Sequence, residues 1–553
     1  MSGLAILVVS FIVFLVAYLV YGRWLAKKWG VDPEAPTPAH TMRDGVDYVP
    51  AKRSVVFGHQ FASIAGAGPI NGPIIAAMFG WLPVLLWIIF GGIFFGAVQD
   101  FAALYASVKN KGRTIGYIIE LHIGRTGKTL FLIFVWLFSI LVVAAFADIV
   151  AVTFNGFAPD GGTIAANASV ATTSMLFIVA AVALGFFLQK AKPNGYLSGA
   201  IAVAILAVCI ALGLSFPAYL HKDLWLWIVF AYIFVASVTP VWVLLQPRDY
   251  LNSFLLVLMI VAAFLGVVIA NPEMHLPAFT GFTVGGMHLF PILFVTVACG
   301  AVSGFHALVS SGTSSKQIDN ERDILPISFG GMLVECLLAV IALVAVGAAA
   351  VGGVMPKESP PVVFAAAVAG FLEGTGLPRE TVYTLITLAV SAFALTSLDS
   401  VARVGRLAFQ ELFTGTGEVK PGPLATLLAN RYVATFFTLL TGYLLARRGY
   451  ADIWPLFGSA NQLLAALAMI ACAVFLKRTR REGWILYVPM VCMLGVTFAA
   501  LAMTIAKLMG KLGGEGGFDV ASDGLQLAFA VLLLGLGVLV AVAGLKRLRG
   551  AAA

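Results

Sequence analysis

Four ionisable side chains lie inside long apolar runs of the chain, where a charge is costly. They are His59, His306, Asp148 and Asp399. Ionisable residues at membrane depth usually mark a pathway for ions, protons or substrate. Histidine titrates near neutral pH, as proton coupling requires, and a carboxylate can balance a bound cation or an ammonium group. We therefore name His59, His306 and Asp399 as candidate ion-coupling residues and Asp148 as a candidate substrate-binding residue.

Three of these residues, His59, His306 and Asp399, also have a structural interpretation. His59 stands near the end of its apolar run, where an imidazole can cap a helix, and a lone buried histidine is often structural. Asp399 precedes two arginines by four and seven residues, so an ion pair on one helical face is the simpler interpretation. Asp100 stands toward the end of its run and can be an interfacial or structural carboxylate. Glu335 is similar to Asp148, a candidate coupling carboxylate or partner of a bound cation, but stands nearer the start of its helix.

A cluster of hydroxyl side chains follows His306 in the stretch SGFHALVSSGTSSKQ, residues 303–317. Hydroxyl and carbonyl oxygens suit a hard monovalent cation, or hydrogen bonds to a small polar substrate. The hydroxyls belong to Ser310, Ser311, Thr313, Ser314 and Ser315. The alternative is that these hydroxyls satisfy the backbone of a neighbouring helix, as serines in helices often do.

The stretch GHQFASIAGAGPINGP, residues 58–73, breaks an apolar run with glycines, prolines and polar groups. Unwinding a helix in hydrocarbon leaves backbone groups without partners, which is tolerable only where they face protein, water or a ligand. The ends of half-helices present N–H groups to a carboxylate and carbonyls to a cation. We expect Ser63, Gly66, Gly68 and Asn71 to bind substrate; close helix packing is the alternative role for the glycines.

A milder interruption, SVTP at 237–240, falls in the apolar run 224–246 and adds Thr239 to the candidate substrate site. Matched interrupted segments in two halves of a chain point to the binding site of a transporter. Five spans from residue 57 end near 216, and five more end near 415. An odd number of spans inverts the second group, so we expect inverted repeats at 57–216 and 217–415.

The composition requires a membrane environment for these elements. Hydrophobic residues make up 61% of the chain and charged residues 11%, whereas soluble domains contain roughly 25% charged residues. Hydropathy predicts an all-α polytopic membrane protein with about fifteen spans, several of them long enough to cross a bilayer of ~30 Å. Residues 1–56 would form an extra span and a cytoplasmic loop, and residues 416–553 would form about four accessory helices.

Basic residues indicate the orientation. Lys and Arg cluster in the loops 23–56, 108–128 and 477–483, whereas 157–171 and 272–287 contain neither. The positive-inside rule then places the N-terminus in the periplasm and the C-terminus in the cytoplasm. The net charge of +8 is thus explained by topology, and nucleic acid is not expected as a partner. The first apolar run is expected to be a retained helix, not a signal peptide.

Enzymatic and metal functions lack their motifs. The five cysteines stand in apolar runs without the spacing of a disulfide framework or metal site. The chain contains no HExxH or GxGD, and GRTGKT at 124–129 has His122 where a phosphate loop needs glycine. We expect no enzyme, no metal and no cofactor, apart from a coupling ion, H+ or Na+. Energy would come from an ion gradient or from the substrate gradient.

Several motifs together resemble one known family. The first interrupted stretch continues into FGWLPVLLWIIFGGIFFGAVQDF (79–101), and QPRDYLNSF (246–254) and TSLDSVARVGR (396–406) follow. With SGFHALVSSGTSSKQI, this pattern resembles the carbon starvation protein A family over residues 50 to about 415. The resemblance implies a bacterial inner-membrane transporter of peptides or pyruvate, related to the amino acid–polyamine–organocation carriers.

The resemblance also implies a LeuT-like core whose first and sixth helices unwind around substrate. A sodium site in such a core lies between its first and eighth helices, which places Ala65 opposite Ser310 and Ser311. We therefore expect ion-coupled import of small carboxylated nutrients by alternating access. Membrane lipid and a peptide or pyruvate are the expected partners. The alternative is a channel or a nutrient-sensing receptor without transport; the sequence does not indicate the oligomeric state.

Overall fold

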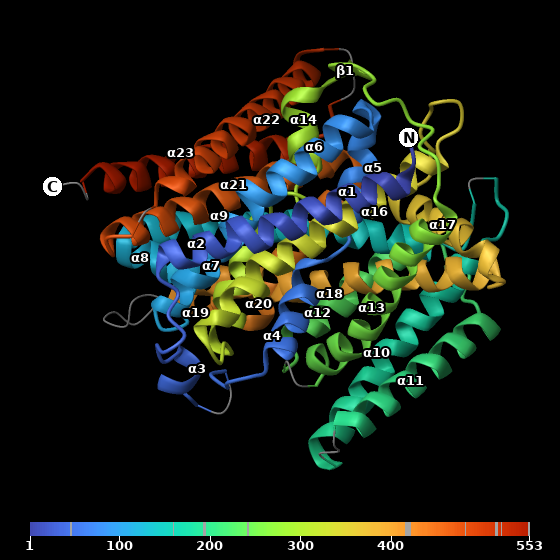
Figure 1. The fold of residues 1–553 in the computed structure, drawn as a ribbon, viewed down its shortest axis with the longest axis horizontal. Helices are drawn as coiled ribbons and strands as arrows, with labels where there is room; N and C mark the ends of the chain where they lie inside the picture. Colours follow the sequence, from blue (N-terminus) through green and yellow to red (C-terminus); the bar gives the residue numbers. More distant parts are fainter. Residues whose placement is uncertain are drawn as a thin grey trace. The chain divides into compact units, whose positions relative to one another are not determined.

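The computed structural model describes residues 1–44, 47–158, 160–191, 195–240, 243–414, 422–481, 483–514, 518–520 and 522–550, and most of them are helical (Figure 1). Among these residues the named strands form one short hairpin, β1 (Thr283–Val284) and β2 (Met287–His288). The expected all-α membrane fold is confirmed. Within the described residues eleven helices are long and apolar enough to span a membrane, or up to twelve if one bent pair forms a single span.

The predicted count of about fifteen spans is not confirmed, because some apolar runs form shorter helices. The run 224–246 forms α12 (Lys222–Val238) and 424–447 forms α20 (Arg431–Ala446), of 17 and 16 residues. Both are shorter than the ~20 residues that cross a bilayer. A further apolar helix, α17 (Pro360–Leu372), was not predicted. Its 13 residues fall below the length that hydropathy can recognise as a span.

The described helices form two compact units whose segments alternate along the sequence. Unit 1 contains residues 1–4, 139–276 and 344–453, and unit 2 contains 5–138, 277–343 and 454–553. The predicted repeats at 57–216 and 217–415 are consecutive segments, and they stay a prediction because packing units and symmetry-related repeats are different properties of a fold. The boundary predicted at 415/416 lies outside the described residues.

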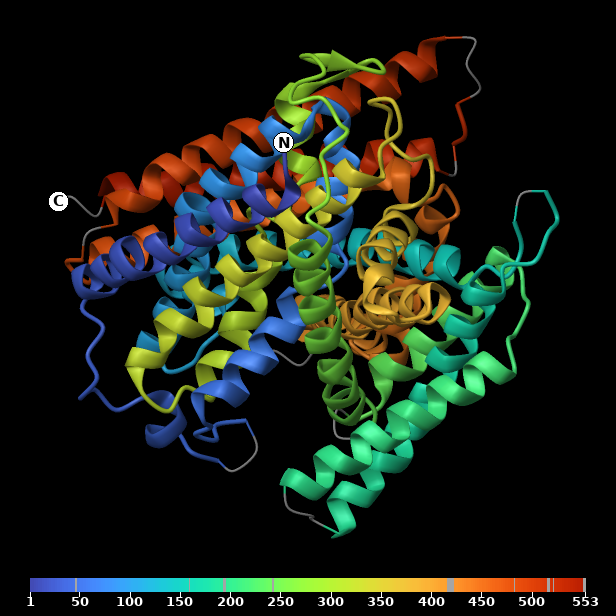
Figure 2. The same cartoon turned by 45° about the vertical axis from the view of Figure 1, so that its right-hand side comes forward.

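Unit 1 is built around α18 (Arg379–Thr414), which packs against α10, α12, α13, α17 and α20. The helices α10 and α11 lie side by side as a long pair (Figures 1 and 2). The elements of unit 1 are the C-terminal part of α9 (Arg125–Phe154), α10 (Ala165–Ala191), α11 (Gly195–Ser215), α12, α13 (Leu245–Ala270), α17, η7 (Glu373–Thr375), α18, α19 (Pro423–Leu428) and α20.

Unit 2 contains the segment that the sequence identified as broken. Its N-terminal elements are most of α1 (Gly3–Val16), η1 (Ala17–Gly22), α2 (Arg23–Trp29), α3 (Pro38–Thr41), α4 (Arg53–Ile64), α5 (Gly68–Ala76), η2 (Ala77–Phe79), α6 (Trp81–Gly91), η3 (Gly92–Gly96), α7 (Ala97–Lys109), α8 (Ile115–His122) and the start of α9. Its later elements are β1, β2, α14 (Leu289–Thr296), α15 (Gly304–Gly312), η4 (Ser314–Lys316), η5 (Glu321–Asp323), η6 (Pro326–Gly330), most of α16 (Gly331–Ala349), most of α21 (Tyr450–Arg478), η8 (Trp484–Leu486), α22 (Tyr487–Gly513) and α23 (Asp523–Gly550).

The first interruption lies where the glycines and prolines predict it. Helix α4 ends at Ile64, α5 begins at Gly68, and the two helices are bent by 44°. Pro69 stands in the first turn of α5, where the N–H that proline lacks has no partner within the helix. The sequence therefore determines both the end of one half-helix and the start of the next.

A second interruption lies in the run 288–311, where the sequence predicts a continuous span. Helix α14 ends at Thr296, and α15 begins at Gly304 with Ser303 as its N-cap residue. We call residues 297–303 the unwound segment. No proline marks the break at this point, so the local sequence gives no strong signal for it.

Polar side chains of α21 satisfy the backbone on both sides of the unwound segment. Trp454 Nε1 donates to the carbonyl of Thr296 at 3.1 Å, and Gln462 Nε2 donates to that of Phe294 at 2.6 Å. Asn461 Oδ1 accepts from the N–H of Phe305 at 3.1 Å and from the Ser303 hydroxyl at 3.3 Å. A helix that the sequence assigns to an accessory region is therefore part of the support of the second interruption.

The SVTP stretch forms a helix end and not a break within a helix. Thr239 is extended and ends α12, and α13 begins at Leu245. Arg403 donates to the carbonyls of Ala236 and Thr239, and Arg406 donates to that of Ser237. Cations stabilise the negative C-terminal end of a helix, so two arginines of α18 satisfy this terminus.

The close contact between α15 and α21 gives a testable prediction of stability. A Cβ at Gly304 would lie 2.3 Å from Ala465 N and 2.4 Å from Asn461 O, which are backbone atoms. Because the backbone cannot rotate away, Gly304→Ala is expected to destabilise the protein by about 1–3 kcal/mol or more. The measurement is thermal unfolding of the detergent-solubilised protein, followed by intrinsic fluorescence.

The matched control is Gly312→Ala, at the other end of the same helix, where nothing lies within 4 Å of the new Cβ. This variant should keep or slightly raise the midpoint of unfolding, because alanine favours helix by about 1 kcal/mol over glycine. Equal midpoints for the two variants would show that the close approach of α15 to α21 does not limit the stability of the protein.

Candidate functional site

The two interrupted helices cross in unit 2. Helix α4 contacts α15 and α5 contacts α14, so the N-terminal half of each interrupted helix lies against the C-terminal half of the other. A Cβ at Gly68 would lie 2.5 Å from Cys299 Cβ, and one at Gly72 would lie 2.7 Å from the carbonyl oxygen of Thr296. The glycines therefore do permit close packing, and they bring the two breaks into contact.

Asn71 is the clearest candidate for a ligand contact at this crossing. Residues 64–74 are all buried, and the side chain of Asn71 is fully inaccessible. Neither its amide nitrogen nor its amide oxygen has a hydrogen-bond partner among the described residues. An unpaired buried amide costs about 1–3 kcal/mol, which a bound polar ligand could recover. Ser63, in contrast, donates its hydroxyl to the carbonyl of His59 at 2.9 Å.

His306 lies between two acids in the same unit. Its Nδ1 hydrogen-bonds Asp100 Oδ2 at 2.8 Å, and its Nε2 lies 3.2 Å from Glu335 Oε2. All three side chains are fully buried. His306 stands in the first turn of α15, Asp100 on α7 and Glu335 on α16. The sequence marked these residues one at a time, and the tertiary fold brings them together.

The predicted ion ligands Ser310 and Ser311 make hydrogen bonds within unit 2. Gln60 Nε2 donates to Ser310 Oγ at 2.9 Å, and Ser314 Oγ donates to Gln60 Oε1 at 2.5 Å. Ser311 Oγ donates to the carbonyl of Ala307 at 2.6 Å and accepts from the N–H of Ile115 at 3.1 Å. These bonds match the structural alternative for the hydroxyls, and a cation site including Ala65 stays a prediction.

His59 lies on α4, the first half of the first interrupted helix, and is partly buried. Its Nε2 has no hydrogen-bond partner among the described residues. A coupling role for His59 stays a prediction.

Asp148 lies in unit 1, where both of its oxygens have partners. Lys222 Nζ lies 2.7 Å from Oδ1, and the N–H of Tyr450 donates to Oδ2 at 2.8 Å. Lys222 begins α12 and Tyr450 begins α21, so this carboxylate joins two helix N-termini to α9. Anions are stabilising at such positions. Binding of a substrate amine by Asp148 stays a prediction and would require the amine to compete with Lys222.

Asp399 forms an ion pair with a different arginine from the two that its spacing suggests. In unit 1 it pairs with Arg248 of α13 and accepts a hydrogen bond from the Tyr232 hydroxyl at 2.6 Å. Arg403 and Arg406 instead bind the end of α12, as described above. The expected intrahelical pair is therefore wrong, because a buried cation of another helix and a helix terminus compete for these groups.

The structure assigns the candidates to both units. Unit 2 contains His59, Ser63, Ala65, Gly66, Gly68, Asn71, His306, Ser310 and Ser311, and unit 1 contains Asp148, Thr239 and Asp399. Asn461 was not singled out from the sequence. A polar Asn-Gln pair in the middle of the apolar helix α21 is the signal that could have found it.

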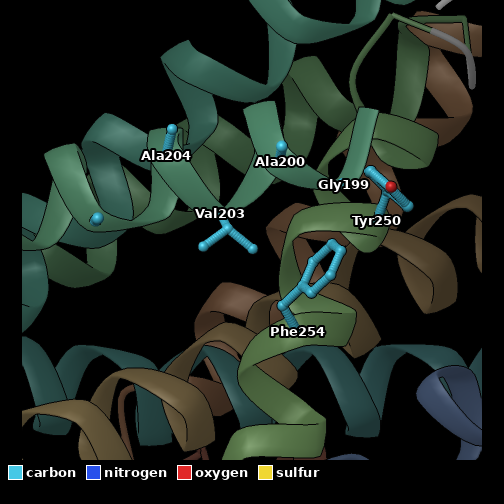
Figure 3. Close-up of a pocket in the computed structure, with 7 residues that line it drawn as sticks. Gly199, Ala200, Val203, Ala204, Tyr250 and Phe254 are labelled. Carbon is cyan, nitrogen blue, oxygen red and sulfur yellow. The ribbon is translucent and has the colours of Figure 1, made fainter. Parts of the chain in front are cut away.

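An open apolar depression lies elsewhere in unit 1, between α11 and α13 (Figure 3). Small apolar residues of α11 line it, together with Tyr250 and Phe254 of α13. This lining offers a carboxylated ligand no charged partner. Among the described residues, no group of three or more His, Cys, Asp or Glu side chains could hold a metal ion.

The sequence of the chain matches one protein family over most of its length. The model of the family described as carbon starvation protein CstA matches residues 2–360 and 348–500. Two solved structures are also similar, MhsT in complex with L-phenylalanine and the Eremococcus coleocola manganese transporter. MhsT has a TM-score of 0.48 and 13% sequence identity, and the match covers 90% of this chain and 99% of MhsT. The manganese transporter has a TM-score of 0.44 and 14% identity, and the match covers 90% of this chain and 95% of that transporter. At these scores we draw no argument from them.

Curated relatives agree with the family match. The peptide transporter CstA of Escherichia coli K12 is 34% identical over 90% of this chain and 80% of its own length. The pyruvate/proton symporter BtsT of the same organism is 34% identical over 94% of this chain and 84% of its own length. The peptide transporter CstA of Bacillus subtilis is 31% identical over 99% of this chain and 97% of its own length. The chain therefore belongs to the carbon starvation protein CstA family.

Proposed function

We propose that this protein is a secondary active transporter that imports small carboxylated nutrients, peptides or pyruvate, across the bacterial inner membrane. The observation that carries the proposal is the crossing of two interrupted helices at a buried, unpaired amide, Asn71. Such crossings are where transporters bind substrate during alternating access. The names of the relatives supply the two substrate classes, which share a carboxylate.

The N-terminus of α5 is the proposed carboxylate site. Helix N-termini carry partial positive charge and free N–H groups, which suit an anion. Gly66 lies in the break, Gly68 begins α5, and the buried amide of Asn71 lies in the first turns of the same helix. A carboxylate and its neighbouring carbonyl could accept from the backbone and from Asn71 together.

We further propose an inverted-repeat core in which α4–α5 and α14–α15 are the matched interrupted helices. Each is followed by a span containing a π-helical turn, η3 or η6, and then by a buried acid. Asp100 follows the break at Gly66, and Glu335 follows the break at Gly300, at nearly the same distance along the chain. This supports an inverted repeat whose second interrupted helix is 289–312 and not 224–246, with more helices between the two than the four of a simple five-plus-five arrangement.

Protons are the proposed coupling ion. BtsT is named as a proton symporter, and His306 lies between two acids in this chain. The predicted sodium ligands Ser310 and Ser311 already have hydrogen-bond partners.

The basic loops support an N-terminus in the periplasm and a C-terminus in the cytoplasm. No step in this scheme requires enzymatic chemistry.

Counterflow in proteoliposomes tests the transport proposal. Vesicles loaded with unlabelled pyruvate or dialanine should take up the matching labelled compound transiently, because a carrier exchanges bound substrate faster than it moves net substrate. The rate should saturate with concentration. Conductance without saturable counterflow would indicate a channel, and the absence of both would leave a receptor; either result contradicts the proposal.

Two asparagines give a paired test of the substrate site. Asn71→Ala should change the unfolding midpoint little, because its amide has no partner to lose, but should raise the half-saturation concentration about tenfold by removing a ligand hydrogen bond worth about 1.5 kcal/mol. Uptake kinetics and thermal unfolding of the same preparation measure both effects.

The matched variant is Asn252→Ala in unit 1. Asn252 is buried like Asn71, but its amide donates to Thr396 Oγ1 at 2.8 Å. Its removal should therefore destabilise the protein by about 1–3 kcal/mol and leave the half-saturation concentration unchanged. If Asn252→Ala raised the half-saturation concentration and Asn71→Ala only lowered the stability of the protein, the substrate site would not lie at α5.

A further inference from the structure

Three titratable side chains meet beside the unwound segment with no exposure to solvent. Asp100, His306 and Glu335 come from α7, α15 and α16, and each side chain is fully buried. Two buried cysteines are also present, Cys299 in the unwound segment and Cys336 next to Glu335 in α16. No lysine or arginine among the described residues forms an ion pair with the three groups.

The charge on this cluster depends on how many protons it holds. With His306 protonated and both acids ionised, the cluster carries one net negative charge. One more proton makes it neutral. An uncompensated charge in a dry protein interior costs several kcal/mol even after relaxation, and the N-terminus of α15 supplies only about half a positive charge. The buried arrangement is therefore expected to contain the additional proton and to release it when water enters.

The hydrogen bonds indicate which acid takes this proton. Asp100 is held by the bond from His306 Nδ1 at 2.8 Å. Neither oxygen of Glu335 has a hydrogen-bond partner among the described residues, although His306 Nε2 lies 3.2 Å from Oε2 as an ion-pair contact. Glu335 can thus gain or lose a proton without breaking a hydrogen bond, whereas protonation of Asp100 would weaken the charge-assisted bond that Asp100 accepts from His306.

Glu335 also lies where its charge can affect the crossing of the interrupted helices. Ala339, one turn further along α16, faces the unwound segment, because a Cβ at Gly300 would lie 2.8 Å from the Ala339 side chain. The same Cβ would lie 3.5 Å from Pro73 of α5. A change of charge and hydration at Glu335 therefore acts on the segment that contacts the first interrupted helix.

We propose that Glu335 carries the proton exchanged in each transport cycle, and that His306 and Asp100 are the residues that position and balance it. The proposal rests on the proposed transport function and names its coupling group. The step is a proton transfer between bulk water and the Glu335 carboxylate, accompanied by closure or opening of the cavity to water. No other bond forms or breaks.

The test compares exchange with net uptake in proteoliposomes whose membrane potential is clamped at zero. With an inward gradient of about two pH units, one proton per substrate can drive up to roughly 100-fold accumulation, since each unit is a tenfold change in proton activity. Glu335→Gln should keep counterflow of labelled pyruvate or dialanine within about twofold and lose at least tenfold of the gradient-driven accumulation, a deficit of about 1.4 kcal/mol or more.

The control is Glu373→Gln, the same substitution at an exposed glutamate of η7, which should behave as the wild type. Glu335→Asp, which keeps a carboxyl group, should retain coupled uptake with a shifted pH dependence. This second variant also tests the proposal if Glu335→Gln fails to fold. Asp100→Asn should likewise shift the pH of half-maximal uptake without abolishing accumulation, as expected of a positioning residue.

Three results would overturn the assignment of Glu335. The first is wild-type accumulation by Glu335→Gln, or an unshifted pH dependence in Glu335→Asp. The second is loss of dialanine counterflow with pyruvate uptake still coupled, which would make Glu335 the partner of a peptide amine. The third is loss of all counterflow in a stably folded Glu335→Gln variant. Absence of counterflow in the wild-type protein would instead refute the proposed function itself.

Discussion

The constraint on which this structure depends is that backbone groups freed by an interrupted helix must find partners inside the protein. At the second interruption those partners are three side chains of α21, Trp454, Asn461 and Gln462. At the end of α12 they are two arginines of α18. In both cases a polar residue deep in one apolar helix supports a discontinuity in another. Buried polar residues in this chain are therefore first of all the support for its irregular backbone.

Buried polar groups that have no hydrogen-bond partner in the protein are the best candidates for binding a ligand or a proton. Gln60, Ser310 and Asp148 all have hydrogen-bond partners, whereas the amide of Asn71 and the oxygens of Glu335 have no hydrogen-bond partner among the described residues. A fully satisfied buried polar group stabilises one arrangement, and an unsatisfied one costs free energy unless a ligand or proton arrives. This difference separates candidates that the sequence ranks equally, because burial in an apolar run is common to all of them.

Much of the architecture could be predicted from the sequence. The all-α membrane fold follows from composition, and the first interruption follows from Gly66, Gly68 and Pro69, whose backbone preferences are local. The second interruption at 297–303 could not be predicted in this way, since its partners lie on α21, more than 150 residues further along the chain. The partner of Asp399 was mistaken for the same reason: Arg248 is distant in sequence and pairs with it in the fold.

The sequence by itself determined that this chain enters a membrane, where one of its helices breaks, and to which family its motifs are similar. These properties depend on hydropathy, on glycine and proline, and on contiguous motifs, all of which act over short stretches. Only the tertiary structure decided that a second helix is interrupted against the first, and that Asp100, His306 and Glu335 share one fully buried site. Such groupings depend on long-range packing, because the partners of a buried polar group are selected by proximity in space and not by spacing along the chain.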